Sequence, residues 1–121
     1  MKINIPDPCP LNQQMYNEDG SRWFVSRLIE KTKDLPVQEM PITGLNIYNL
    51  CPSSKNMREF VGHIQKVLDA DLTYPIILDD EGYVMDGRHR IAKALLEGHE
   101  SIKFVRFEKT PGPDIVGDEN K

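Results

Sequence analysis

The chain lacks the features that mark a membrane protein or a secreted protein. None of the apolar runs in its 121 residues approaches the ~20 residues that a membrane-spanning helix needs. Residues 1–6 do not form the apolar core that a signal peptide carries. We therefore expect a cytoplasmic protein without a membrane partner.

Cysteine is scarce, which bears on both disulfides and zinc. Cys9 and Cys51 each precede a proline in loop-like sequence, and neither belongs to a Cys-x-x-Cys pair or has a zinc-like spacing to a histidine. In a reducing compartment we expect two unrelated thiols rather than a disulfide. The sequence predicts no metal site made by protein ligands.

The chain also lacks a basic excess, since 15 Lys and Arg residues against 19 Asp and Glu residues give a net charge of −4. A protein that grips a nucleic-acid duplex by its phosphates usually carries a basic surplus. Direct DNA binding is therefore disfavoured. The content of 39% hydrophobic and 28% charged residues is ordinary for a globular domain, and the length suits one domain.

The most informative stretch is 75–98. It predicts a short buried strand at 75–78, a turn at 79–82, a second strand at 83–85 and then a helix. Gly82 is expected to take a positive φ in the turn, and Gly98 stands where a glycine ends a helix. The helix begins in the sequence Asp86-Gly87-Arg88-His89-Arg90.

This strand-to-helix junction predicts an anion site. A helix N-terminus leaves backbone N–H groups unpaired and carries partial positive charge, so the cations Arg88 and Arg90 oppose the helix dipole there. A bound phosphate would resolve that conflict, because arginine offers it a bidentate fork and Gly87 permits close approach to the backbone. The plain alternative is two surface arginines and a packing or capping histidine.

The rest of the chain predicts one domain, 21–109, between an N-terminal arm, 1–20, and a flexible tail, 110–121. Within the domain the expected elements are a helix at 22–35, a strand at 37–42, an undecided segment at 45–50, a helix at 54–68 capped by Ser53 or Ser54, and a strand at 101–107. Pro41 places the strand at 37–42 at a sheet edge or marks its end. His63 falls beside the apolar stripe of the second helix and is interpreted as a boundary residue. Together these elements predict an α+β fold, a small mixed β-sheet packed with three helices.

Residues 75–107 resemble the ParB/sulfiredoxin superfamily, in particular its ParB-like N-terminal (ParB-like nuclease) domain. The resemblance is carried by the strand at 75–78, by the Asp-Gly-x-His-Arg helix start, and by Ala92, Ala94, Gly98 and Ile102. With the helix at 54–68 it covers roughly 36–107. It implies a ParB/sulfiredoxin-like fold and a site for a nucleoside triphosphate with Mg²⁺.

By that resemblance Gly87, Arg88, His89 and Arg90 hold the phosphates. Asp86 then shapes the turn or helps to hold magnesium through the phosphates. His89 is the candidate general acid or base, and whether the protein is an enzyme stays open.

The sequence also departs from the family patterns. Sulfiredoxins have a catalytic cysteine directly before the His-Arg pair, where this chain has Arg88. ParB proteins proper have Gly-Glu-Arg-Arg and a following helix-turn-helix domain, which we do not expect here. Related free-serine kinases use a glutamate before the second helix, and 46–50 contains no carboxylate, although Glu39 and Glu59 lie nearby in sequence.

Three functions follow from these observations. The first is a ParB-like nucleotide- or phosphate-binding domain with weak NTP hydrolase or phosphotransfer activity. The alternative is a non-catalytic protein-interaction module related to chromosome and plasmid partitioning proteins. A nuclease ranks third, because the run Asp79-Asp80-Glu81 is explained more simply by a turn than by two-metal chemistry.

Overall fold

The computed structural model describes residue 11, residues 14–46, residue 50 and residues 53–116. Cys9, Cys51 and the centre of the undecided segment, 47–49, lie outside this part of the chain. The described elements are β1 (Met15–Glu18), β2 (Ser21–Phe24), α1 (Val25–Lys31), β3 (Gln38–Pro41), the 3₁₀ helix η2 (Ile42–Gly44), α2 (Met57–Asp69), β4 (Ile76–Leu78), β5 (Val84–Asp86), α3 (Arg88–Leu96) and β6 (Ser101–Arg106).

The fold is α+β, as the sequence predicts, with a four-stranded sheet in the order β3-β6-β4-β5 and a separate two-stranded sheet of β1 and β2. β4 and β6 are parallel, whereas β3 pairs antiparallel with β6 and β5 pairs antiparallel with β4. β3 is an edge strand that ends at Pro41, where a proline costs no internal hydrogen bond.

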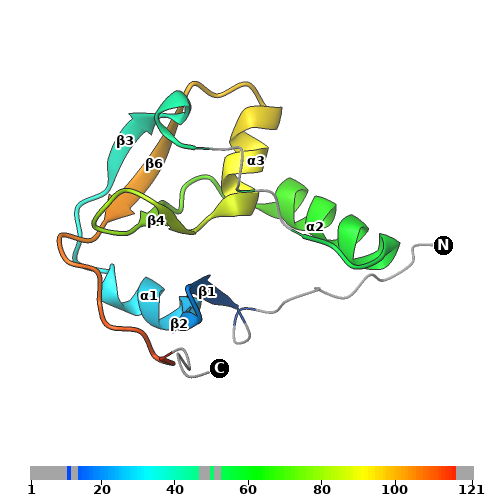
Figure 1. Ribbon diagram of the computed structural model, residues 1–121. Coiled ribbons are helices and arrows are strands. Elements are labelled where there is room, and N and C mark those ends of the chain that lie inside the picture. The colour runs from blue at the N-terminus through cyan, green and yellow to red at the C-terminus, as the bar shows by residue number, and fades with distance from the viewer. Residues whose placement is uncertain (1–10, 12–13, 47–49, 51–52, 117–121) are drawn as a thin grey trace.

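The four-stranded sheet buries side chains on both of its faces. Figure 1 shows α3 on one side of the sheet and α1 with the β1–β2 hairpin on the other. Ile76 and Leu78 of β4 belong to the core cluster that includes Ile91 and Ala94 of α3, while Ile77 belongs to the cluster around Trp23 and Leu28. The sequence of β4 is a continuous apolar run because both faces of this strand are buried against other elements.

The turn between β4 and β5 is held by the buried carboxylate of Asp79. Its Oδ1 accepts hydrogen bonds from the backbone N–H groups of Glu81, at 2.9 Å, and Tyr83, at 2.8 Å. Gly82 adopts a φ of +93°, as the sequence predicts. Asp79 thus acts as the hydrogen-bond acceptor of a tight turn, which confirms the simple explanation of the acidic run.

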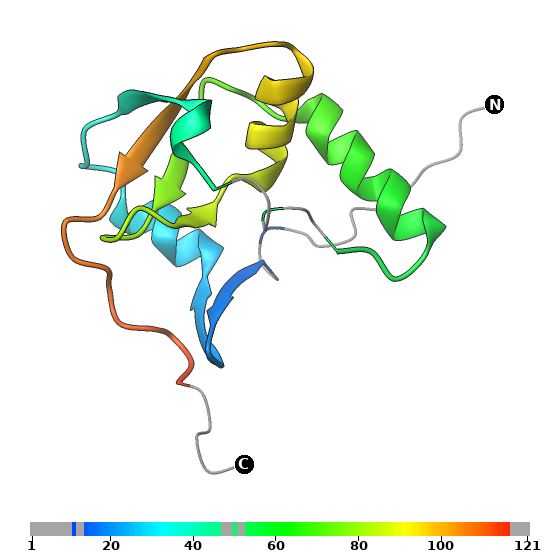
Figure 2. The same ribbon diagram turned by 45° about the horizontal axis from the view of Figure 1, so that its top comes forward.

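Helix α2 lies outside the sheet. It projects sideways and meets α3 (Figures 1 and 2). Its N-cap is Asn56, whose side chain accepts from the N–H of Glu59 at 2.9 Å, so the prediction of Ser53 or Ser54 as the cap is wrong. Gly62 is the buried residue of α2, an unusual outcome for so amphipathic a helix.

The prediction of a helix at 22–35 is also wrong in part, because the first residues of this range form strand β2. Asp19 and Gly20 have φ values of +52° and +85° and join β1 to β2 in a hairpin. Aspartate followed by glycine favours this kind of two-residue turn. Trp23 therefore lies on a strand, where it is buried as expected of a core residue.

Residues 110–116 are not the frayed tail that the sequence predicts. The indole N–H of Trp23 donates to the carbonyl of Pro111 at 2.8 Å, and the N–H of Arg22 donates to the carbonyl of Ile115 at 2.8 Å. The carboxylate of Asp114 accepts from the N–H of Phe24, the N-cap residue of α1, at 2.9 Å. The first turn of α1 contains no acidic residue of its own. Asp114, from a segment far along the chain, supplies the acidic group that favours a helix N-terminus.

We predict that Asp114→Ala lowers the free energy of unfolding by about 1–2 kcal/mol, because it removes a hydrogen bond to a helix start. Its ion pair with Arg27, at 3.0 Å, adds little, since the Arg27 side chain is 62% exposed. Urea unfolding measures the effect, and Asp34→Ala, in the exposed turn after α1, is the control. Equal losses in the two variants would contradict the role given to Asp114.

Candidate functional site

The candidate site begins at the junction between β5 and α3, where Gly87 is the N-cap residue. Gly87 has a φ of +119°, and a Cβ placed on it would lie 2.4 Å from Cγ2 of Ile76. Glycine is therefore required here by its backbone conformation and by the neighbouring strand. The sequence attributes this glycine to a close approach by a ligand; in the structure Ile76 makes the close approach.

Arg90, in the first turn of α3, pairs with Asp86 at the end of β5. The guanidinium Nη2 donates to Oδ2 of Asp86 at 2.8 Å, and the two side chains are 22% and 16% exposed. The Nε–H of Arg90 is buried and finds no hydrogen-bond partner within the described part of the chain. A buried donor without an acceptor costs about 1–3 kcal/mol. A ligand that offers an acceptor to this N–H would therefore be favoured.

Arg88 lies apart from Arg90. It is exposed and does not line the cavity described below. Its positive charge acts instead on the phenol of Tyr16, on the β1–β2 hairpin, where it favours a lower pKa. Burial, followed by the charges of Glu18 and Asp79, raises the pKa of Tyr16 to about 12, and the Arg88 cation acts in the opposite direction. The structure thus does not bring the two predicted arginines together around one anion.

His89 instead meets His63, which the sequence marked as a boundary residue of α2. Nδ1 of His63 lies 2.8 Å from Nε2 of His89, and the two rings are stacked with their centroids 5.1 Å apart. One ring must donate the proton of this bond and the other must accept it. The signal in the sequence was weak, because nothing local shows that two residues 26 positions apart meet.

A cavity of about 650 Å³ opens between α2, the start of α3 and the end of α1. Gly87, His89 and Arg90 line it from α3, and Lys66 lines it from α2. Three carboxylates, Asp69, Asp71 and Asp86, also lie on its walls. The cavity therefore combines a helix N-terminus and two cations with an acidic rim.

A second hollow of about 630 Å³ lies beside Phe104 and Arg106 of β6. The guanidinium of Arg106 donates to the backbone carbonyl of Asp80 at 2.6 Å. Because this cation already holds the β4–β5 turn and no helix begins there, the hollow offers less to an anion than the first cavity does.

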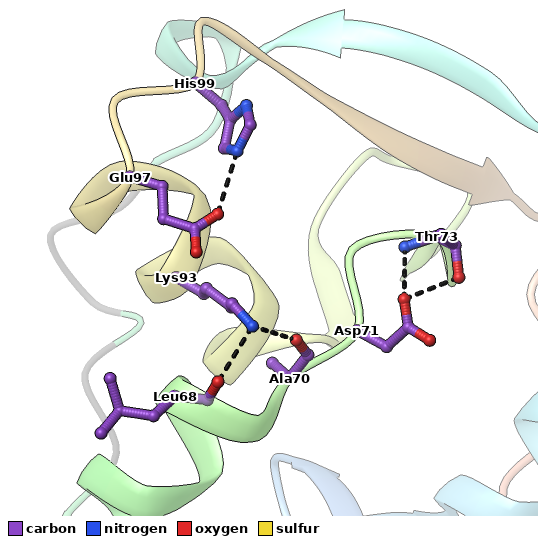
Figure 3. A network of polar contacts seen from close by, with 7 residues as sticks. All are labelled: Leu68, Ala70, Asp71, Thr73, Lys93, Glu97 and His99. Atoms are coloured by element: carbon purple, nitrogen blue, oxygen red, sulfur yellow. Dashed lines mark hydrogen bonds and ion pairs between the residues drawn. The ribbon is translucent and has the colours of Figure 1, made fainter.

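Lys93 fastens α2 to α3, a role that the sequence did not reveal. Its Nζ donates to the carbonyls of Leu68, at 2.9 Å, and Ala70, at 2.6 Å (Figure 3). These carbonyls belong to the last turn and C-cap of α2, which intrahelical bonds leave unsatisfied. A cation at this helix end also complements the dipole, so Lys93 fixes one wall of the cavity.

The segment after α2 turns on Asp71 (Figure 3). Its Oδ1 accepts from Oγ1 of Thr73 at 2.7 Å and from the N–H of Thr73 at 2.9 Å. These hydrogen bonds, the hydroxyl's first, hold the pKa of Asp71 below its usual value of 3.8. Asp71 therefore stays ionised at the cavity rim.

Magnesium fits this site only together with phosphates. Among the residues that the structure describes, histidine, cysteine and carboxylate side chains do not gather in groups of three or more that could hold a metal ion. Mg²⁺ commonly takes one or two protein carboxylates and draws its other ligands from phosphates and water. Asp86, Asp69 or Asp71 can supply such a carboxylate beside a bound phosphate chain.

Comparisons with protein-family models, with curated proteins and with solved structures gave no match for this chain. The resemblance to the ParB/sulfiredoxin superfamily thus stays a prediction from the residues quoted above. In the described part of the chain, no helix has the length and apolar character to cross a membrane.

We predict that Gly87→Ala lowers the free energy of unfolding by about 2–5 kcal/mol, through backbone strain and the collision with Ile76. Gly98→Ala is the matched control, because Gly98 also has a positive φ, +78°, but faces open space. The control should lose only about 1–2 kcal/mol, the cost of the backbone conformation. Equal losses in urea unfolding would contradict the packing explanation.

We predict that Thr73→Val raises the pKa of Asp71 toward its usual value, because it removes the hydroxyl donor and keeps the amide. Because folding lowers the pKa of Asp71, its ionised carboxylate stabilises the folded protein at pH values above the usual aspartate pKa. This stabilisation is lost as the pH falls through the folded-state pKa. NMR titration of the carboxyl carbon measures the shift. Thr110→Val is the control and should leave the Asp71 pKa unchanged. An unchanged Asp71 pKa in Thr73→Val would refute the role given to the Thr73 hydroxyl.

Proposed function

We propose that this protein binds a nucleoside triphosphate, or a closely related phosphate ester, in the cavity between α2 and α3. The observation that carries the proposal is Arg90, a cavity-lining arginine at a helix N-terminus whose buried Nε–H has no partner among the described residues. A phosphate oxygen is the acceptor that suits such a donor best. The resemblance to ParB-like domains supports the same ligand.

The size of the cavity supports a nucleotide. Ligand sites generally measure about 300–1,000 Å³, and the volume of about 650 Å³ lies within that range. The first N–H groups of α3 and the side chain of Lys66 add donors to Arg90. Arg88, which lies outside the cavity, is left out of the proposed contacts.

The charges on the walls support a ligand that arrives with magnesium. Lys66 and Arg90 carry two positive charges, against three negative charges on Asp69, Asp71 and Asp86. A bare triphosphate would meet repulsion from these carboxylates, whereas Mg²⁺ held by the phosphates would attract one of them. The proposal is accordingly for a nucleotide with Mg²⁺.

Weak hydrolysis or phosphoryl transfer would rely on His89. The ring lines the cavity and shares a proton with His63 in a 2.8 Å hydrogen bond. An imidazole so placed can accept a proton from an attacking hydroxyl or water. The second candidate function is a non-catalytic interaction module, which the exposed apolar side of α2 favours.

We predict that calorimetric titration with ATP, CTP and GTP, each with Mg²⁺, detects binding of at least one. Arg90→Ala should weaken that binding by about tenfold or more, the value of one charge-assisted hydrogen bond. Arg88→Ala is the matched control, since it removes the same charge two residues away but outside the cavity, and should change affinity by less than about threefold.

Because Arg90→Ala leaves Asp86 without its partner, Lys66→Met provides an independent variant on the other wall. Thermal unfolding of every variant separates lost binding from lost folding. Absence of binding to all three nucleotides, or equal effects of the Arg88 and Arg90 variants in folded proteins, would refute the proposal.

A further inference from the structure

Part of the cavity wall is apolar and takes no part in the phosphate contacts. Leu11, Ile29 and Tyr74 line the cavity and are 50%, 40% and 63% exposed. They come from three separate segments, which are the N-terminal arm, α1 and the turn before β4. Single exposed apolar side chains need no explanation, but three that converge on one cavity indicate a surface for an apolar part of a ligand.

We propose that this wall is the subsite for the base of the nucleotide, and that the base stacks on the ring of Tyr74. The subsite rests on the proposed function, because it holds the part of the ligand that is not phosphate. An apolar wall in a cavity with two cations fits a ligand that has a flat ring at one end and charge at the other. A sugar phosphate would instead bring hydroxyl groups against Leu11 and Ile29, which cannot hydrogen-bond to them.

The path of the chain places Tyr74 near the phosphate contacts. Ile76 of β4 packs against Gly87, the N-cap residue of α3, so the residues that lead into β4 pass the start of that helix. Tyr74 precedes Ile76 by two residues, so their Cα atoms are at most about 7 Å apart. A base on Tyr74 and phosphates at Arg90 are thus close enough to belong to one ligand.

The backbone at Tyr74 is held in place before a ligand arrives. Its N–H donates to the carbonyl of Asp71 at 3.2 Å, within the turn that Asp71 forms with Thr73. Pro75 follows, and a residue that precedes proline is restricted to extended conformations. A tyrosine side chain has only two χ angles to fix, so ordering its ring against a base costs little conformational entropy.

Loss of the ring should weaken nucleotide binding without affecting phosphate binding. Tyr74→Leu should weaken the binding of each nucleotide that the wild type binds by about five- to a hundredfold, the range for one base stacked on an aromatic ring. Tyr74→Phe should bind nucleotides like the wild type, because it keeps the ring. Methyl triphosphate, a triphosphate ester without a base, should bind equally to all three proteins.

Calorimetric titration of the full chain with Mg²⁺ tests the subsite, using ATP, CTP, GTP and methyl triphosphate as ligands. The wild type should bind nucleotide at least about tenfold more tightly than methyl triphosphate. Tyr83→Leu is the matched control, because Tyr83 is 58% exposed but does not line the cavity. This variant should bind every ligand like the wild type.

Two results would overturn the base subsite and leave the phosphate site standing. One is equal affinity of the wild type for nucleotide and methyl triphosphate, and the other is unweakened nucleotide binding by folded Tyr74→Leu. Absence of binding by all four ligands would overturn both the subsite and the proposed function.

NMR of the wild type tests the same contact without a substitution, so it decides the matter even if Tyr74→Leu does not fold. Nucleotide should move the ring-proton resonances of Tyr74 upfield, because a stacked base shields them, and methyl triphosphate should not. Unmoved ring protons at saturating nucleotide would overturn the subsite.

Discussion

The contact between Ile76 and Gly87 determines where α3 begins. Because a side chain at position 87 would overlap Ile76, β4 and the N-terminus of α3 can come together only at a glycine with a positive φ. This junction directs Arg90 back onto Asp86 and His89 toward His63. The position of α2, and with it the cavity, follows from these contacts.

Helix α2 is positioned by polar contacts rather than by burial. His63 and the carbonyls at its C-terminal end meet α3, while most of its large apolar side chains are exposed. An element with few buried apolar contacts has low local stability. The cavity therefore has one wall that belongs to the sheet's core and one wall that is held by a few hydrogen bonds.

Patterns that depend on neighbouring residues allowed correct predictions. The apolar run of β4, the positive φ of Gly82 and the end of β3 at Pro41 are confirmed. At the end of α3 Gly98 donates to Leu95, and the next N–H bonds the carbonyl of Ala94, the pattern of a glycine-terminated helix. Each of these features follows from backbone sterics or from local burial.

The wrong predictions concern turns and contacts between distant segments. The sequence Asp19-Gly20 is typical of a hairpin turn. The apolar residues that follow it suggested a helix instead, so Trp23 was predicted to lie on a helix. The bond from Trp23 to Pro111 joins residues 88 positions apart, and composition alone made 110–116 look frayed. The error at the site has a local cause. The sequence grouped Arg88 with Arg90, but side chains two residues apart on a helix point to different sides, and Arg90 lines the cavity whereas Arg88 does not.

The central claim is that the cavity between α2 and the start of α3 receives phosphate groups. Amide NMR spectra recorded during addition of a nucleotide with Mg²⁺ test it most directly. We expect the largest shifts at the amides of 87–91 and 62–70, with little change around Arg106 at the second hollow. Shifts confined to the second hollow, or unchanged amides at 87–91 at saturating nucleotide, would contradict the account.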